Sequence, residues 1–204
     1  MSRRAYCDGP LHSEVGGGFA AMHKVQDLAR FQLPPDFRGR SAVVVQLWWI
    51  VRDTLFLCSP QFMYGWRNAL LRLFGAKIGK GVMLRPTVRI TYPWKLKIGD
   101  NVWCGDFVEL YTLGEIEIGA DVVVSQNSYI CAASHDHTVP TFDIYTKRVI
   151  IEPEVWVAAD VFVGPGVRIG RGAVIGARST LLSDAPEMMI MAGSPAKVVR
   201  PRAG

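Results

Sequence analysis

Residues 130–138 read ICAASHDHT and bring together side chains that could do chemistry. Cys131, His135 and His137 have the spacing C-x3-H-x-H, which would suit a zinc ion if a fourth ligand or a water completed the site. Cys131 could instead act as a nucleophile with His135 as its partner. In a third interpretation His135 is a general base beside Asp136, because histidine titrates near neutral pH. The elements around this stretch have to decide among the three.

The chain has the size and composition of one globular domain. It has 204 residues, of which 50% are hydrophobic and 20% are charged, and this composition excludes a disordered chain. The net charge of +5 favours an anionic partner. The four cysteines are widely spaced and form no C-x-x-C pair, so we expect them to be reduced and the protein to be cytoplasmic. We expect no signal peptide, because the first residues lack a continuous apolar run.

Two segments precede the regular part of the sequence. Residues 1–40 are rich in Gly, Pro and charge, which predicts a flexible N-terminal arm. Residues 41–75 are apolar and aromatic and predict two helices that meet near CSPQF at 58–62. Their most apolar stretch, at 42–51, is too short to cross a membrane. We favour packing of these helices against the rest of the protein over a position in a membrane interface.

From residue 76 the sequence repeats with a period of six. Aliphatic residues recur at this interval near the end of the chain, at Ile151, Val157, Val163, Ile169, Ile175 and Leu181. Small or β-branched residues follow each of the first five by four places, at Val155, Val161, Val167, Ala173 and Ser179. An earlier block runs from Ile98 to Leu110, shifts by two residues, and resumes from Ile118 to Ile130.

A period of six indicates stacked coils of short strands. Successive apolar positions would rotate around a helix that has 3.6 residues per turn, whereas strands separated by turns keep them all on the inside. A β-sandwich is disfavoured because its turns recur at irregular intervals. The sequence therefore predicts a mainly β fold, a solenoid of stacked coils preceded by the arm and the helical segment.

The hexads resemble the hexapeptide repeat of the left-handed parallel β-helix acyltransferases. The resemblance covers residues 76 to about 201, as a β-helix domain at 76–183 and a C-terminal CoA-binding tail at 184–204. VWVAADVFVGPGVRIGRGAVIGARSTLLSDAP and MAGSPAKVVR are similar to the CoA-binding end of the galactoside and maltose O-acetyltransferases. GWRNALLRLFGAKIG, PWKLKIGDN and VSQNSYICAASHD resemble the colanic acid biosynthesis acetyltransferases, which extends the match back to about residue 41.

The resemblance implies that a catalytic loop at about 131–149 interrupts the coils and carries the base. The hexads break after Ile130 and resume at Ile151, and His135 stands at the family's catalytic position. Asp136 is a second catalytic candidate, although adjacent side chains rarely share a direction. Zinc is disfavoured because only two histidines lie near the coils. Cys131 is disfavoured as a nucleophile because no activating charge accompanies its thiol.

Glu109 and Tyr111, in the neighbouring coil, are our candidates for binding the acceptor. Gly105 and Leu113 stand where the galactoside enzymes have Asn and Asp. This departure implies that the acceptor differs from theirs.

The resemblance also implies that acetyl-CoA is the acetyl donor and that no metal is required. Trp156, Ala159 and Ala177 match positions that line the pantetheine channel. Lys197 and Arg200 match basic positions near the phosphates, where cations are favoured.

One part of the cofactor pattern differs from the family. Leu182 and Ser183 replace the usual Thr-Lys at a further cofactor position, which removes one cation.

The function implied by the resemblance is O-acetyl transfer to a sugar hydroxyl in exopolysaccharide (colanic-acid-like) biosynthesis. The expected partners are a sugar or lipid-linked saccharide, two further copies in a homotrimer, and the inner face of the cytoplasmic membrane through residues 42–74. Alternatives on the same coils are a xenobiotic or serine-type acetyltransferase and a non-catalytic scaffold. Nucleic-acid binding is not expected, because no recognisable module accompanies the positive charge.

Overall fold

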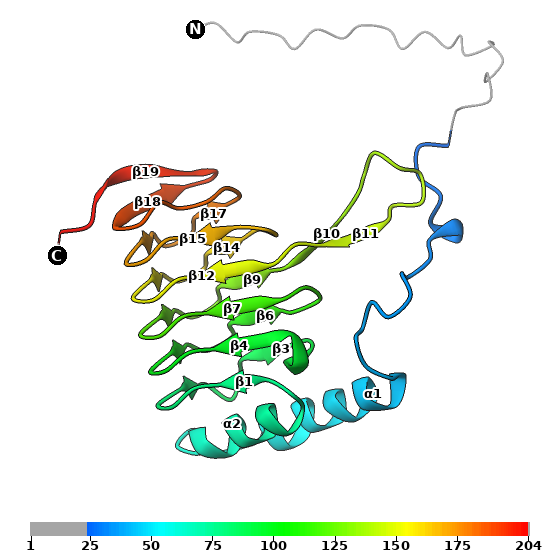
Figure 1. The fold of residues 1–204 in the computed structure, drawn as a ribbon, viewed down its shortest axis with the longest axis horizontal. Coiled ribbons are helices and arrows are strands. Elements are labelled where there is room, and N and C mark those ends of the chain that lie inside the picture. The colour runs from blue at the N-terminus through cyan, green and yellow to red at the C-terminus, as the bar shows by residue number, and fades with distance from the viewer. Residues whose placement is uncertain (1–23, 204) are drawn as a thin grey trace, which may run out of the picture.

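The computed structural model describes residues 24–203, which wind into a solenoid of stacked coils (Figure 1). Each of five complete coils contributes one strand to each of three parallel sheets, here named faces A, B and C. Face A contains β1 (Lys77–Ile78), β4 (Leu96–Ile98), β7 (Ile116–Ile118), β12 (Val149–Ile151) and β15 (Arg168–Ile169). Face B contains β2 (Met83–Leu84), β5 (Trp103–Cys104), β8 (Val123–Val124), β13 (Trp156–Val157), β16 (Val174–Ile175), β18 (Met189–Gly193) and, at its edge and antiparallel to β18, β19 (Ala196–Pro201). Face C contains β3 (Arg89–Ile90), β6 (Glu109–Tyr111), β9 (Tyr129–Cys131), β14 (Phe162–Val163) and β17 (Thr180–Leu181).

The six-residue period marks the inward-facing positions of these coils. Val163 is fully buried and lies beside Ile130 in one neighbouring coil and Leu181 in the other. The small hexad residues, such as Ala173 and Ser179, are buried as well. Equivalent positions stack in register, so the inside of the solenoid is one continuous apolar core. The predicted mainly β solenoid is confirmed.

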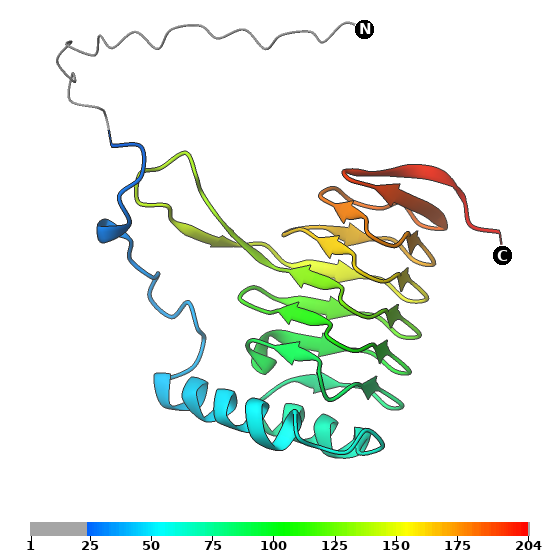
Figure 2. The ribbon, with the colours of Figure 1, turned by 180° about the vertical axis from the view of Figure 1, so that it is seen from behind.

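A layer of helices covers the first coil (Figures 1 and 2). α1 (Ala42–Val51) continues into the π-helical turn η2 (Arg52–Phe56), and α2 (Tyr64–Leu73) follows. The chain changes direction around Pro60, within the stretch that the sequence predicted. Trp48 is fully buried between this layer and the coils, and its indole Nε1–H donates to the carbonyl of Ile90 at 2.9 Å. One side of the helices is therefore packed on the solenoid. No helix in the described residues has the length and apolar character to cross a membrane.

Extra residues accumulate at one corner of the solenoid, where face C leads into face A. The chain passes this corner after Ile90, after Leu110 and after Ile130, and each passage is longer than one hexad. The first passage contains the 3-10 turn η3 (Pro93–Lys95), and the third contains a β-hairpin. The two-residue shift after Leu110 in the sequence is the second passage around this corner.

Buried contacts tie these successive passages together. The hydroxyl of Thr112, fully buried, accepts a hydrogen bond from the backbone N–H of Tyr92 at 2.7 Å and donates to the carbonyl of the same residue at 3.0 Å. Tyr92, Leu113 and Ala133 also form a small second core with Val45 of α1. The corner is therefore a packed column that supports the hairpin.

Residues 24–40 run along the outside of the molecule from the hairpin to the helices (Figure 1). Their one turn of helix is η1 (Leu28–Arg30). The backbone N–H of Asp27 donates to the carbonyl of Pro140 in the hairpin at 2.6 Å. At the other end, the indole N–H of Trp94 donates to the carbonyl of Arg38 at 2.6 Å. The predicted N-terminal arm is thus attached at both ends of this stretch, and its residues 1–23 lie outside the described part of the chain.

Candidate active site

A β-hairpin projects from the corner between faces C and A (Figure 1). It consists of β10 (Ala133–His135) and β11 (Ile144–Thr146), and its antiparallel register pairs His135 with Ile144. Beyond this pair, the backbone N–H of Asp136 donates to the carbonyl of Asp143 at 2.7 Å. The hairpin lies within the stretch where the sequence predicted a catalytic loop.

The imidazole of His135 is held in one orientation. Its Nδ1 lies 2.8 Å from the carbonyl oxygen of Phe142. Because a carbonyl oxygen can only accept, Nδ1 carries the hydrogen of the neutral ring and Nε2 keeps its lone pair. The ring also stacks on Phe142, with centroids 4.4 Å apart and planes within 7°, and a tilted Phe31 ring lies 6.0 Å away. The arrangement leaves Nε2 able to accept a proton.

His135 lines an open hollow of about 500 Å3. The lining also includes His137, which is exposed, and Lys147, whose ammonium lies 5.6 Å above the ring of Tyr145. A polar ligand in this hollow would meet a proton acceptor and a cation together.

Asp136 is engaged by its own loop. One carboxylate oxygen accepts hydrogen bonds from the backbone N–H of Thr138 at 2.8 Å and from its hydroxyl at 2.6 Å. The hydroxyl bond and then the backbone bond hold the pKa of Asp136 below its usual value. These bonds shape the turn after His135, and a catalytic role for Asp136 stays a prediction.

Cys131 is poorly placed for either chemistry considered for it. Its thiol is buried and donates to the carbonyl of Ala133 at 3.0 Å. Burial raises the pKa of this thiol, which disfavours the nucleophilic thiolate. Across residues 24–203, no three His, Cys, Asp or Glu side chains gather into a group that could hold a metal ion, so Cys131, His135 and His137 do not form the considered zinc cluster.

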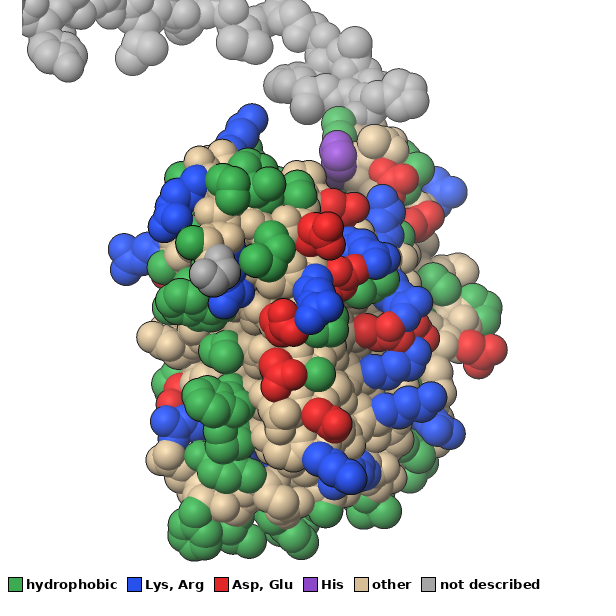
Figure 3. Space-filling view, turned by 60° about the vertical axis from the view of Figure 1, so that its left-hand side comes forward, with side chains coloured by type: hydrophobic (Ala, Val, Ile, Leu, Met, Phe, Trp, Pro, Cys, Tyr) green, Lys and Arg blue, Asp and Glu red, His purple; other side chains and the backbone are tan. Residues whose placement is uncertain are grey.

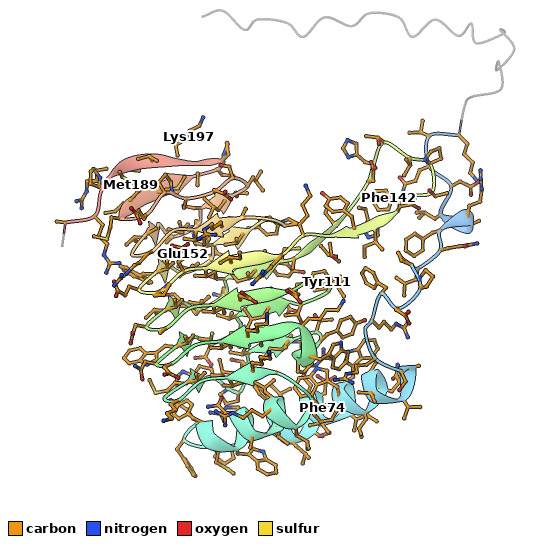
Figure 4. The ribbon with its side chains drawn as sticks, in the orientation of Figure 1. Phe74, Tyr111, Phe142, Glu152, Met189 and Lys197 are labelled. Carbon is orange, nitrogen blue, oxygen red and sulfur yellow. The ribbon has the colours of Figure 1, made fainter. Side chains whose placement is uncertain are left out.

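Tyr111 lies at the base of the hairpin (Figure 4). It pairs with Cys131 in the register of β6 and β9 and packs against the second core. Its ring lies 5.7 Å from that of Tyr129, which stacks on Phe162 at 5.8 Å. Tyr111 therefore begins a column of aromatic rings on face C, next to the hairpin that carries His135.

Glu109 lies two residues earlier on the same strand, where it pairs with Tyr129. Burial raises the pKa of its carboxyl group, while Arg89 and then Arg52 act in the opposite direction. The acceptor-binding role of Glu109 and Tyr111 stays a prediction.

The predicted cofactor residues fall into three places, and the first is face B. Trp156 is 47% exposed there, and its Nε1–H donates to the hydroxyl of Ser125 at 3.0 Å. The register continues on the same side of the sheet from Trp156 through Val174 and Ile190 to Arg200 on β19 (Ala196–Pro201). Trp156 and Arg200 thus point to the same side.

The second place is the corner between faces B and C. Ala159 and Ala177 occupy equivalent positions in successive coils, where the backbone N–H of Arg178 donates to the carbonyl of Ala159 at 2.9 Å. Ala192 lies over this corner, next to Gly176: a Cβ placed on Gly176 would lie 3.1 Å from the Cβ of Ala192. Lys197 is the register partner of Ala192, so it belongs to the same region.

The third place is the corner that also carries the hairpin. Leu182 and Ser183 follow β17 there and are exposed, two coils beyond the hairpin. They are separated from Trp156 and Arg200 by the width of the solenoid.

One chain keeps His135 apart from most of the predicted cofactor residues, which lie on face B and at its corner with face C. The corner with the hairpin lies opposite face B, and Figure 4 shows Phe142 and Lys197 on opposite sides of the molecule. Sequence reasoning missed Phe31, Phe142 and Lys147, which surround His135. The two phenylalanines belong to no periodic pattern. The one signal for Lys147 in the sequence is its position, a basic residue just before the hexads resume at Ile151.

Comparisons with known proteins agree with this architecture. Residues 148–183 match the family model described as bacterial transferase hexapeptide (six repeats). The chain is 55% identical over 178 residues to the putative colanic acid biosynthesis acetyltransferase WcaF of Escherichia coli (strain K12), covering 87% of this chain and 98% of that protein.

Two solved structures share the fold. A maltose O-acetyltransferase from Clostridium difficile 630 has a TM-score of 0.72 and 25% identity, covering 80% of this chain and 90% of the other. A hexapeptide-repeat acetyltransferase from Vibrio cholerae, solved with acetyl coenzyme A, has a TM-score of 0.72 and 23% identity, covering 81% and 92%. The resemblance inferred from the hexads is confirmed. Because it is more than half identical to an acetyltransferase along nearly that protein's whole length, the chain belongs to the hexapeptide-repeat acetyltransferase family.

Proposed function

We propose that this protein transfers an acetyl group from acetyl-CoA to a hydroxyl group of a saccharide in exopolysaccharide synthesis, with His135 as the general base. The observation that carries the proposal is the imidazole of His135, held through Nδ1 at the wall of an open hollow so that Nε2 keeps its lone pair. The acceptor class is supported by the 55% identity to an acetyltransferase named for colanic acid biosynthesis.

His135 supplies the proton transfers of this reaction. Acetyl-CoA supplies a thioester whose carbonyl carbon accepts the new bond and whose sulfur leaves. Nε2 takes the proton of the acceptor hydroxyl as its oxygen bonds to that carbon, and returns it to the sulfur as the C–S bond breaks. The carbonyl of Phe142 holds Nδ1–H throughout and stabilises the imidazolium between the two steps. Both products form by direct transfer, with no acyl group on the protein.

The cofactor end has the composition that CoA requires. Ala159 and Ala177 are small residues that let a pantetheine chain approach the backbone, and Trp156 offers an exposed aromatic ring on the adjoining face B. Lys197 and Arg200 are exposed cations at the same end and suit the phosphates.

We propose a homotrimer in which each active site combines two chains. The support is the placement of the His135 hairpin and Lys197 on opposite sides of one solenoid, so that a neighbouring chain has to supply the missing half. Subunit complementation tests this assembly. Inactive His135→Gln chains refolded together with inactive Lys197→Gln/Arg200→Gln chains should regain activity, because some mixed sites contain both intact halves. Failure of the mixture, with each variant shown by light scattering to be trimeric, would contradict a shared site.

The proposed mechanism is tested by acetyl-CoA turnover, followed through thiol release with extracted lipid-linked oligosaccharides as acceptors. We expect His135→Gln to lower kcat by about 10²–10⁴-fold, the usual contribution of a general base. His137→Gln is the matched control, because His137 lines the same hollow but is exposed, and it should keep most of the activity.

Two outcomes would overturn this mechanism. The first is full turnover by His135→Gln. The second is activity that a chelator abolishes and added zinc restores, which would return the hairpin to the metal-site interpretation.

A further inference from the structure

The helices that cover the first coil have an outward side that nothing in the described chain covers. Trp48, Phe56 and Leu71 face the coils and are buried. On the opposite side, Phe62 and Leu73 are each 79% exposed and Val43 is 76% exposed. Figure 3 shows hydrophobic side chains gathered at this end of the molecule.

The exposed apolar residues of the two helices adjoin each other, because Leu47 of α1 and Leu73 of α2 line one hollow. We name as the apolar platform Val43, Leu47, Ile50, Phe62, Trp66 and Leu73, all at least 41% exposed. Its α1 members repeat at intervals of four and three residues, and Trp66 and Leu73 are seven apart on α2, so each set lies on one face of its helix. The two helices are joined by the indole N–H of Trp66, which donates to the carbonyl of Leu55 at 3.0 Å.

Negative charge on the platform is minimal. Asp53 is the only acidic residue between Ser41 and Gly75 in the sequence. Both of its carboxylate oxygens accept hydrogen bonds from the guanidinium of Arg52, at 2.8 and 2.9 Å. That contact lowers the pKa of Asp53 and balances its charge.

Positive charge borders the platform. Arg40 lines an open hollow of about 450 Å3 together with Leu47 and Leu73. Arg72 and Lys77 line a second hollow of about 540 Å3 at the end of α2. The guanidinium of Arg72 donates to backbone carbonyls, so its charge is not neutralised. Within the part of the chain that the structure describes, Arg40, Arg72 and Lys77 form no ion pair.

We propose that the apolar platform docks on the surface of a membrane that contains anionic phospholipids. Aliphatic and Trp side chains insert at the boundary between head groups and acyl chains, and basic residues at their border bind the phosphates. A second copy of this chain fits less well, since a twofold contact would place two equally cationic platforms against each other. The docking is interfacial, in keeping with helices too short to span a bilayer.

The position of the platform suits an acceptor attached to a lipid, a point that rests on the proposed function. The hairpin with His135 leaves the solenoid between the coils of β7 and β12, two to three coils from β1. At about 4.8 Å per coil, this is roughly 10–15 Å along the solenoid axis. The helical layer adds about 10 Å. A saccharide of several units on a lipid in the same membrane would span this distance.

The test is flotation of the full-length protein with vesicles on a density gradient. The wild type should float with vesicles of phosphatidylcholine and phosphatidylglycerol, and poorly with phosphatidylcholine alone. Phe62→Glu/Leu73→Glu should lower the bound fraction by about tenfold or more, because two inserting side chains become anionic. Arg40→Gln/Lys77→Gln should weaken binding only to the anionic vesicles, and added salt should do the same to the wild type.

Matched controls separate docking from general stickiness and from catalysis. Phe107→Asn removes a phenyl ring that is 66% exposed on a turn of the solenoid, and Arg178→Gln removes a cation that is 86% exposed far from the helices. Both should float like the wild type. The platform variants should retain acetyl-CoA turnover with a water-soluble saccharide acceptor, so that failure of docking and failure of the proposed reaction are read separately.

Three results would overturn the proposal. The wild type could remain at the bottom of the gradient with both kinds of vesicle. Phe62→Glu/Leu73→Glu could float as well as the wild type, which would place the membrane contact elsewhere. The wild type could fail to bind vesicles while Phe62→Glu/Leu73→Glu forms smaller particles than the wild type in light scattering. The platform would then be a contact between copies of the chain.

Discussion

Thr112→Val should destabilise the corner that supports the His135 hairpin. Valine has nearly the shape of threonine, so the substitution removes two hydrogen bonds without opening a cavity. The carbonyl of Tyr92 keeps the backbone N–H of Lys95 as a partner at 3.1 Å, but the backbone N–H of Tyr92 loses its acceptor in a fully buried setting. An unpaired buried donor costs about 1–3 kcal/mol, and we expect the free energy of unfolding to fall by that amount.

The matched control is Thr54→Val. The hydroxyl of Thr54 also donates to a backbone carbonyl, that of Ile50, at 2.6 Å, but it is exposed and water replaces the lost bond. This substitution should change the free energy of unfolding by no more than about 0.5 kcal/mol. Urea titrations at one fixed protein concentration measure both variants, and an unchanged m-value shows that the midpoints compare stability. Equal losses in the two variants would refute the argument, because burial would then not determine the cost.

Three further substitutions test the charged contacts of the fold. Arg67→Met should lower the free energy of unfolding by about 3 kcal/mol or more. The fully buried guanidinium donates to the carbonyls of Leu84, Pro60 and Gln61, and each of these hydrogen bonds contributes ~1 kcal/mol. Urea titration measures the loss, and an unchanged free energy of unfolding would contradict this reasoning. Glu109→Gln should stabilise the protein at pH 7, because burial raises the pKa of Glu109 and the folded protein therefore disfavours its ionised form. This gain in stability should vanish below the unfolded pKa of about 4.3, where the carboxyl group is protonated in both states. Thermal unfolding at pH 7 and below that pKa checks the sign. Glu117→Gln should destabilise the protein at pH 7, because the Lys97 contact and then Arg148 lower the pKa of Glu117. The free energy of unfolding should fall by about 0.3–1 kcal/mol, and this loss should shrink in high salt and disappear as the pH falls through the lowered pKa. A loss unchanged by salt would refute the ion-pair explanation.

The solenoid was predictable because its coils repeat a local period, and the place of the hairpin was predictable because it interrupts that period. Val157, Val163 and Ile169 recur at the spacing of one strand and one turn, and burial of that face follows whatever the rest of the chain does. The residues between Ile130 and Ile151 lack the six-residue period and cannot continue the coils, so the position of the loop could be read from the sequence as well. The family resemblance added a role for His135, which composition and spacing left open among three chemistries.

The surroundings of that histidine were not predictable from its neighbours in the sequence. The carbonyl of Phe142 reaches Nδ1 only because the hairpin folds back on itself, and Phe31 arrives from a segment about a hundred residues earlier. Neither contact leaves a periodic pattern. The raised pKa of the Cys131 thiol, which argues against a nucleophile, likewise depends on burial that the isolated motif does not reveal.

The sequence by itself determined which side chains point into the coils, where the helices change direction near Pro60, and where the coils are interrupted. These features depend on spacing along the chain, because apolar residues at a regular spacing share one face of their element and that face is buried. Tertiary structure alone decided which imidazole nitrogen of His135 keeps its lone pair, that the hairpin and Lys197 lie on opposite sides of the solenoid, and that one side of the helical layer is left uncovered by residues 24–203. Each of these depends on contacts between segments far apart in the sequence, and local spacing carries no information about which distant surfaces meet.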